Sequence, residues 1–149
     1  MPVDYRIYPD FGIVQVVFSG LVRAIENIAA VEDYRNSAGY DPLLHILMDL
    51  ADCSFPSDLF ADMMLLKQRL GLHYRTRDPR SHTAIYAPGN VAFGMARLFR
   101  SAANPDAPNP VKAFRHAGDA LRFVDLDPSR PEVARLLRPA TSPGRLHGP

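Results

Sequence analysis

Three aspartates lie close together where an apolar stretch of the sequence ends and a polar stretch begins. Asp49 is the one charged residue near the end of the run 43–50, and Asp52 and Asp58 follow soon after it. Carboxylates gathered at one site could act as a general acid and a general base. Aspartates at a strand end or a helix start serve more often as turn and cap residues. We therefore expect no catalytic residue here, and a hydrolase or transferase is the least favoured class of function.

The residues that could bind a metal or a cofactor are too scattered to indicate a site. The histidines, at positions 45, 73, 82, 116 and 147, show none of the short spacings that place two imidazoles on one metal ion. The sequence contains neither a GxGxxG motif nor a Walker loop. Cys53 has no basic neighbour in the sequence that would favour its thiolate. We expect no metal, no cofactor and no enzymatic activity, and we expect His45 to be a hydrogen-bonded core residue.

The composition is typical of one soluble domain. The chain has 149 residues, of which 47% are hydrophobic, and a formal net charge of +1. Nucleic acids and acidic membranes select clustered lysine and arginine, so this charge argues against both as partners. A single cysteine, no cationic leader and no apolar run long enough for a membrane span together predict a cytoplasmic protein without membrane insertion.

The run 43–50 is apolar without alternation, which predicts a central strand that is buried on both faces. Apolar spacing and turn residues predict the other elements, which are strands at 5–8, 13–19, 83–87 and 111–115 and helices at 22–37, 57–70, 90–103 and 117–125. After the opening hairpin, helices and strands alternate. This order predicts an α/β fold with a small mixed sheet of about five strands.

We expect residues 1–127 to form this single domain. From residue 128 onward, prolines, glycines and arginines dominate the composition, so residues 128–149 are predicted to be a mobile tail. Within this tail, Glu132 to Leu137 could form one docked turn.

The second predicted helix carries apolar side chains on two sides. One side is the narrow stripe expected to face the core, formed by Leu59, Met63, Leu66 and Leu70. Phe60 and Met64 lie about a quarter turn or more away from that stripe. Another helix or the tail would cover this second patch, or the patch would form the contact of a homodimer.

The third predicted helix has a broad core side and an opposite side with one aromatic residue. The core side comprises Val91, Ala92, Met95, Ala96, Leu98, Phe99 and Ala102. Phe93, Arg97 and Arg100 fall on the opposite side, where the Arg97 guanidinium could lie over the Phe93 ring. Phe93 is thus expected to be exposed unless something covers it, either as a lone surface aromatic or as part of a contact for a protein or an anionic ligand.

The connection after the second helix is the most basic loop of the chain. Residues 73–82 contain Arg75, Arg77 and Arg80 and a histidine at each end, against the single acid Asp78. A solvated loop that holds its charges apart is the simplest interpretation. A contact with an anion or a phosphate is the alternative.

Three segments resemble the STAS-like superfamily, the domain that sulfate transporter tails share with anti-sigma-factor antagonists. They are Leu47 to Leu50, Ala84 to Arg97 with its Asn-Val-Ala-Phe-Gly-Met-Ala-Arg motif, and Val111 to Arg115. The likeness covers residues 4–125 and is greatest to a branch of short, stand-alone bacterial proteins of unknown function. It implies about four helices packed mainly on one face of the sheet, and a regulatory or binding role instead of catalysis.

The chain departs from that family where its antagonists are phosphorylated. They carry an Asp-Ser-Ser-Gly-like motif at the start of the helix after the central strand, and here the stretch around Ser57 has the position but not the motif. A phosphate on Ser57 would be favourable at a helix N-terminus, although the carboxylate of Asp58 would oppose it. We therefore regard Asp49, Ser57 and Asp58 as a candidate site, located where the central strand ends and the next helix starts.

Two classes of function remain. The first is a non-enzymatic interaction domain that self-associates or binds a protein partner, through Phe60 and Met64 or through Phe93, Arg97 and Arg100. The second is a domain that binds a small apolar or anionic ligand. The second and third helices supply many leucine, methionine and phenylalanine side chains for such a site, and Arg97 or the basic loop could hold an anion.

Overall fold

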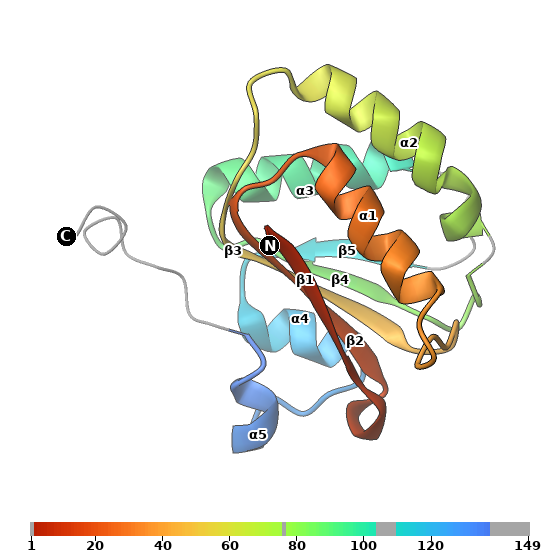
Figure 1. Ribbon diagram of the computed structural model, residues 1–149. Coiled ribbons are helices and arrows are strands. Elements are labelled where there is room, and N and C mark those ends of the chain that lie inside the picture. Colours follow the sequence, from red (N-terminus) through yellow and green to blue (C-terminus); the bar gives the residue numbers. More distant parts are fainter. Residues whose placement is uncertain (1, 76, 104–109, 138–149) are drawn as a thin grey trace.

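Five strands form one mixed sheet at the centre of the molecule (Figure 1). The computed structural model describes residues 2–75, 77–103 and 110–137. The strands cross the sheet in chain order, as β1 (Val3–Tyr8), β2 (Ile13–Leu21), β3 (His45–Ser54), β4 (Thr83–Tyr86) and β5 (Val111–Phe114). β1 pairs antiparallel with β2, and the later neighbours are parallel. The predicted α/β fold with a mixed sheet is confirmed.

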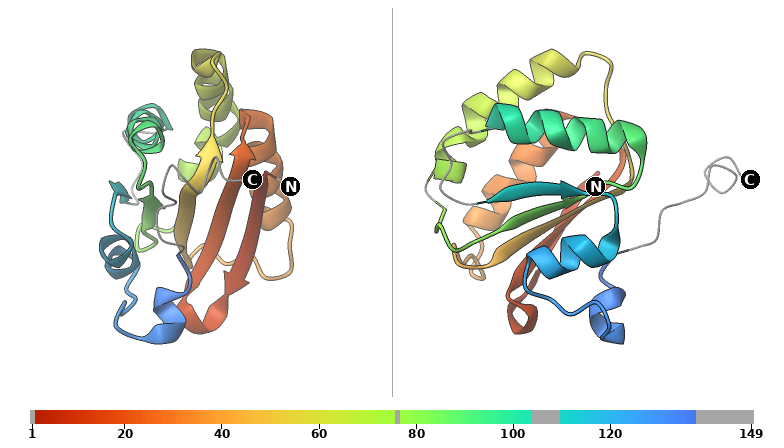
Figure 2. Two further views of the ribbon diagram at one scale, coloured as in Figure 1. Left: turned by 90° about the vertical axis from the view of Figure 1, so that its left-hand side faces the viewer. Right: turned by 180° about the vertical axis from the view of Figure 1, so that it is seen from behind.

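The three long helices lie on the same face of the sheet (Figures 1 and 2). They are α1 (Ala24–Arg35), α2 (Leu59–Arg75) and α3 (Asn90–Ala103). The short helices α4 (Ala117–Phe123) and α5 (Pro131–Ala134) lie on the other face, and a 3₁₀ turn, η1 (Pro9–Phe11), joins β1 to β2. The helices are therefore packed mainly on one face, as the resemblance implied.

β3 is the central strand and contributes to a core on each face of the sheet. Ile46, Met48 and Leu50 are buried in the core beneath the long helices. Leu47 is buried in the core beneath α4 and α5. Because side chains alternate along a strand, a strand covered on both faces is apolar throughout, which is the pattern seen in the sequence.

β3 continues past its predicted end to Ser54. Between Asp49 and Asp52, two residues of β3 stand opposite a single residue of β2, which is a β-bulge. The Oδ1 atom of Asp49 accepts a hydrogen bond of 2.9 Å from the backbone N–H of Ala51 inside this bulge. Asp49 therefore lies within the strand and stabilises the bulge, and the prediction that it sits at the carboxyl end of the strand is wrong.

α2 also extends further than predicted. Gly71 does not end the helix, which continues to Arg75. Leu70 and His73 are three residues apart on the same side of the helix, and both are buried. The packing of this last part of α2 outweighs the low helix propensity of glycine.

The packed chain continues beyond the predicted domain boundary at residue 127. Val133 and Leu137 are buried in the core beneath α4 and α5. The side-chain amide of Gln15 on β2 donates a hydrogen bond to the backbone carbonyl of Leu136. The predicted docked turn is therefore present, and the rest of the predicted mobile tail, residues 138–149, lies outside the described residues.

Candidate functional site

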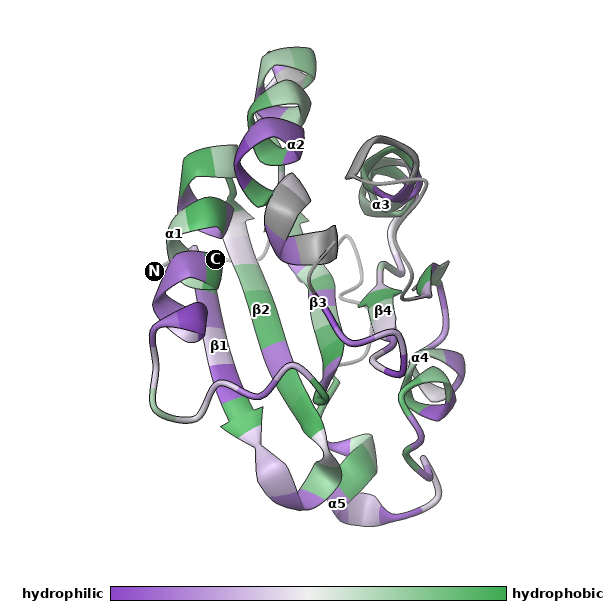
Figure 3. Cartoon of the chain, turned by 90° about the vertical axis from the view of Figure 1, so that its right-hand side faces the viewer, coloured by the Kyte–Doolittle hydropathy of each residue, from purple (hydrophilic) through white to green (hydrophobic). Residues whose placement is uncertain are grey.

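α2 lies farther from the sheet than its neighbours and packs mainly on α1 and α3 (Figure 3). Met63 and Leu66 reach from α2 toward the core that the long helices share with the sheet. An apolar pocket lies beneath them, between α2, the neighbouring helices and the sheet. It is the candidate functional site.

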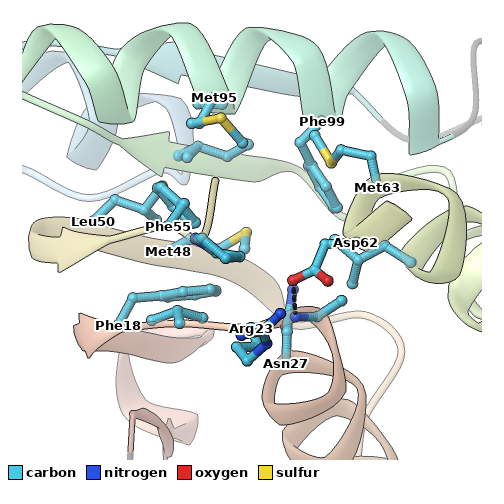
Figure 4. A pocket seen from close by; sticks show the side chains of 16 residues that line it. Phe18, Arg23, Asn27, Met48, Leu50, Phe55, Asp62, Met63, Met95 and Phe99 are labelled. Carbon is cyan, nitrogen blue, oxygen red and sulfur yellow. Dashed lines mark hydrogen bonds between the residues drawn. The ribbon is translucent and has the colours of Figure 1, made fainter. Parts of the chain in front are cut away.

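Apolar side chains form nearly all of the pocket wall, around about 50 Å³ of free space. Its floor comes from the strands, through Phe18, Met48, Leu50 and Ile85. Its roof comes from α2 and α3, through Met63, Leu66, Met95 and Phe99. Figure 4 shows the methionine and phenylalanine side chains facing one another across this space. Methionine is flexible and polarizable, so such a wall can adapt to ligands of different shape.

Two carboxylates near the start of α2 hold it to the start of α1. The Oδ2 atom of Asp62 accepts a hydrogen bond of 2.8 Å from the backbone N–H of Ala24 (Figure 4). A guanidinium nitrogen of Arg23 lies 3.1 Å from Oδ2 of Asp58 in an exposed ion pair. The Asp62 contact places a negative charge at the N-terminus of α1, where the helix dipole favours it.

The structure does not bring Asp49, Ser57 and Asp58 into one site. Asp49 pairs in register with Tyr86 on β4, so both side chains point to the face covered by α4. Ser57 and Asp58 are exposed just before α2, which covers the opposite face. The β-bulge and the continuation of β3 account for this separation.

Cys53 has the environment of a structural thiol. Burial, together with the nearby carboxylates of Asp49 and Asp52, raises the pKa of the Cys53 thiol to about 12. The thiolate is the nucleophilic form of cysteine. At neutral pH this side chain is therefore held in its unreactive, protonated state.

The second apolar patch of α2 is exposed to solvent. The side chains of Phe60 and Met64 have exposed fractions of 79% and 51%. On α3, the buried arc is narrower than predicted, because Val91 and Leu98 at one edge of the expected core side are exposed. The outer surfaces of α2 and α3 thus carry large apolar side chains.

Phe93 is half-buried, because other parts of the chain cover the ring. The ring packs against the core beneath the long helices, and the guanidinium of Arg115 lies 4.3 Å from the ring centroid. Arg115 also donates a hydrogen bond of 2.8 Å to Oδ1 of Asn90. Arg97 and Arg100 are exposed on α3. The cation that stacks on Phe93 comes from the segment after β5, a contact that helical spacing could not reveal.

The basic loop is not simply solvated, because Arg77 is buried, with an exposed fraction of 4%. Its guanidinium donates hydrogen bonds to the carbonyl oxygen of Leu44 at 3.1 Å, to Oγ1 of Thr83 at 3.3 Å and to Oγ of Ser81. Arg80 is exposed, which is what the prediction of a solvated loop implies for this residue. One arginine of this loop thus belongs to the interior of the protein.

His45 is hydrogen-bonded as expected, but it is half-buried at the start of β3 and is not one of the buried core residues. Its Nδ1 atom accepts a hydrogen bond of 2.8 Å from the backbone N–H of His82, so its Nε2–H faces Oδ2 of Asp125 at 3.1 Å. Across the described ranges, no three histidine, cysteine, aspartate or glutamate side chains gather where they could hold a metal ion. In the same ranges, no helix has the length and apolar character needed to cross a membrane.

Comparison with known proteins identifies the fold. A scan against protein-family models and a search of curated proteins find no significant match. Among solved structures, the chain is similar to an uncharacterized protein of the DUF3478 family with a SpoIIAA-like fold from Shewanella loihica PV-4. The TM-score is 0.50 and the identity 17%, over 82% of this chain and 91% of that chain. The STAS-like fold implied by the sequence is confirmed.

The pocket was only partly foreseeable. The supply of methionine and phenylalanine on the second and third helices was visible in the sequence, and Met63 was placed on the inner stripe. The sequence does not distinguish Phe18 and Met48 from core residues, because a strand residue that lines a pocket has the same pattern as one that fills a core. The spacing of apolar residues carries no signal for the space left between them.

Proposed function

We propose that this chain is a non-enzymatic binding domain that takes up a small apolar molecule between its sheet and α2. The observation that carries the proposal is the pocket itself, whose floor and roof are formed by apolar side chains around open space. Ligand sites in proteins are concave, mostly apolar and few per protein. The protonated Cys53 thiol supports a binding role instead of nucleophilic catalysis.

α2 is the element that would admit the ligand. The free space of about 50 Å³ is far below the roughly 300 Å³ at which ligand pockets begin. A ligand larger than this space therefore requires the roof to move. α2 rests on two helices and has few direct contacts with the sheet, so it can shift without breaking strand pairing.

Filling the pocket should block binding. Met63→Trp places a larger side chain in the roof, whereas Met64→Trp adds the same side chain on the exposed side of the same helix. With the neutral apolar dye N-phenyl-1-naphthylamine, we expect Met63→Trp to bind about tenfold more weakly or worse, a loss of about 1.4 kcal/mol. Met64→Trp should bind like the wild type. Equal binding by both variants would refute a pocket beneath α2.

Self-association is the second candidate function, and the exposure of Phe60 and Met64 favours it. Large exposed apolar side chains that lie together on a helix commonly mark protein contacts. If α2 forms a homodimer contact, Phe60→Asp should convert a dimer to a monomer in sedimentation velocity at micromolar concentration. Leu98→Asp changes an exposed leucine on α3 in the same way and serves as the control. A wild-type chain that is monomeric throughout this range would exclude the dimer.

The surface formed by Phe93, Arg97 and Arg100 is the weaker site for a protein partner. Phe93 is half-buried beside Arg115, so the exposed groups described there are arginines and not the aromatic ring. Exposed arginines commonly contribute to protein contacts. Arg97→Glu, compared with Phe60→Asp in the capture of any partner, would show which surface that partner uses.

A further inference from the structure

Asn27 is a polar residue on the buried side of α1. Together with Ala24 and Ile28 it occupies the first buried positions of this helix, at the spacing of a core-facing side. Its exposed fraction is 6%, and its side chain lines the pocket beneath α2. Figure 4 shows it on the same side of the space as Arg23 and Asp62. An amide therefore stands at a position where the helix pattern predicts an apolar side chain.

The side-chain amide of Asn27 has no hydrogen-bond partner among the described residues. An asparagine side chain offers two N–H donors and one carbonyl acceptor. Buried polar groups are nearly always paired, because an amide that leaves water without gaining a partner loses free energy. The amide atoms of Asn27 are not fully enclosed either, so they meet open space instead of packed side chains. The pocket thus contains a hydrogen-bonding group that the described part of the protein does not use.

The polar neighbours of Asn27 already have partners of their own. Asp62 accepts the hydrogen bond from the backbone N–H of Ala24, and Arg23 forms the exposed ion pair with Asp58. Asn27 also borders a second, smaller apolar pocket of about 40 Å³ toward the end of α2. The amide is therefore a neutral polar group in mostly apolar surroundings.

We propose that the Asn27 amide is the polar anchor of the site beneath α2, and that the ligand is an apolar molecule with one neutral oxygen, in a hydroxyl or a carbonyl group. The Nδ2–H of Asn27 donates a hydrogen bond to this oxygen. The apolar part of the ligand lies against the methionine and phenylalanine side chains of the pocket. This assignment rests on the proposed function and adds the chemical class of the ligand and its orientation.

A neutral oxygen suits this position better than a charged group or a hydrocarbon. Arg23 and Asp62 bring opposite charges to the pocket wall, so neither an anion nor a cation is favoured overall. Burying an ion beside a neutral amide would be costly. A hydrocarbon would cover the amide without giving it a partner, which weakens binding. The site should therefore distinguish ligands of equal size by their polar group.

The test compares four probes with the same number of carbon atoms on the unmodified chain at pH 7.5, by calorimetric titration. They are ethylbenzene, acetophenone, phenylacetate and protonated 1-phenylethylamine. We expect acetophenone to bind at least as tightly as ethylbenzene, although water solvates its carbonyl oxygen better, and both charged probes to bind about tenfold more weakly or worse than acetophenone.

The outcomes separate the two proposals. Tighter binding of ethylbenzene than of acetophenone would overturn the polar anchor and leave the proposed apolar pocket standing. A charged probe that binds as tightly as acetophenone would overturn the neutral ligand. Failure of all four probes to bind would overturn both proposals.

Variants locate the anchor within the pocket. Asn27→Leu replaces the amide with an apolar side chain of similar shape, and the affinity for acetophenone relative to ethylbenzene should fall about tenfold. Asn36→Leu changes an exposed asparagine at the end of α1 and should keep the wild-type ratio. Circular dichroism shows whether each variant is folded, and the four probes on the wild type decide the question if Asn27→Leu does not fold. An unchanged ratio in a folded Asn27→Leu protein would refute the role of Asn27.

The stability of the chain without ligand gives an independent readout. The space beside Asn27 leaves room for the larger leucine, and the variant no longer buries an amide without a partner. We therefore expect Asn27→Leu to raise the melting temperature by roughly 2–4 °C. A folded variant that melts at the same or a lower temperature than the wild type would show that the amide serves the fold, and would overturn its assignment to a ligand.

Discussion

His73 is a single side chain that makes the stability of the protein depend on pH. It is buried near the end of α2, and burial, followed by the charges of Arg77 and Arg35, lowers its pKa to about 4. The pKa of an unfolded histidine is about 6.5. Between these values, the unfolded chain binds a proton that the folded chain does not, so stability rises with pH across this window. His73 therefore contributes stability above about pH 6.5 that is lost as the pH falls toward 4.

This difference in pKa predicts a loss of about 3 kcal/mol of unfolding free energy between pH 7 and pH 4, at about 1.4 kcal/mol per pKa unit. Urea unfolding at a series of pH values measures it. His73→Gln removes the titrating group, so its stability should fall less steeply over this range. His116→Gln, a change at an exposed histidine, should behave like the wild type. If the unfolding free energies of wild type and His73→Gln change in parallel with pH, then His73 is not the source of the pH dependence.

At the scale of the elements, α2 is the one whose attachment determines access to the pocket. Its start is held to α1 by the hydrogen bond from the Ala24 N–H to Asp62 and by the ion pair of Arg23 with Asp58. Hydrogen bonds to charged groups contribute about 1.5–3 kcal/mol, whereas exposed ion pairs contribute about 1 kcal/mol or less. The Asp62 contact should therefore be the main restraint on the opening of α2.

Asp62→Asn keeps the volume of the side chain but removes its charge. We expect the amides in the first half of α2 to exchange with solvent deuterium about tenfold faster in this variant, as a loss of about 1.4 kcal/mol in local stability implies. Asp58→Asn, which disrupts only the exposed pair, should change exchange much less. The rate of dye binding should increase together with exchange. If Asp58→Asn accelerates this exchange more than Asp62→Asn does, then the ion pair is the main restraint on the opening of α2.

The elements themselves were largely predictable from the sequence, and their tertiary surroundings were not. The alternation of helices and strands and the bounds of α3 follow from apolar spacing and caps, which act over a few residues. The bulge after Asp49 depends on pairing with β2, and the cation beside Phe93 comes from Arg115 on a distant segment. Local patterns hold no information about either. Arg77 was expected in a solvated loop for the same reason, because its acceptors on Leu44 and Thr83 come from two other segments.

At the scale of the whole molecule, the sheet forms the floor of the pocket, and α2, which packs on α1 and α3, forms part of its roof. Two small apolar pockets lie on the face of the sheet that the long helices cover. The exposed patch of Phe60 and Met64 lies on the outer side of the same helix. Ligand uptake and self-association would therefore act on one element, and a dimer contact on α2 would restrain the opening of the pocket.

Native mass spectrometry of the wild-type chain with added decanol, measured beside Met63→Trp under the same conditions, decides whether the space beneath α2 is a ligand site. We expect one bound molecule per wild-type chain, lost when the same sample is denatured, and little or no bound mass on Met63→Trp. If the wild type and Met63→Trp carry the same mass, whether both are bare or both are loaded, then the pocket beneath α2 is not where this protein binds an apolar ligand.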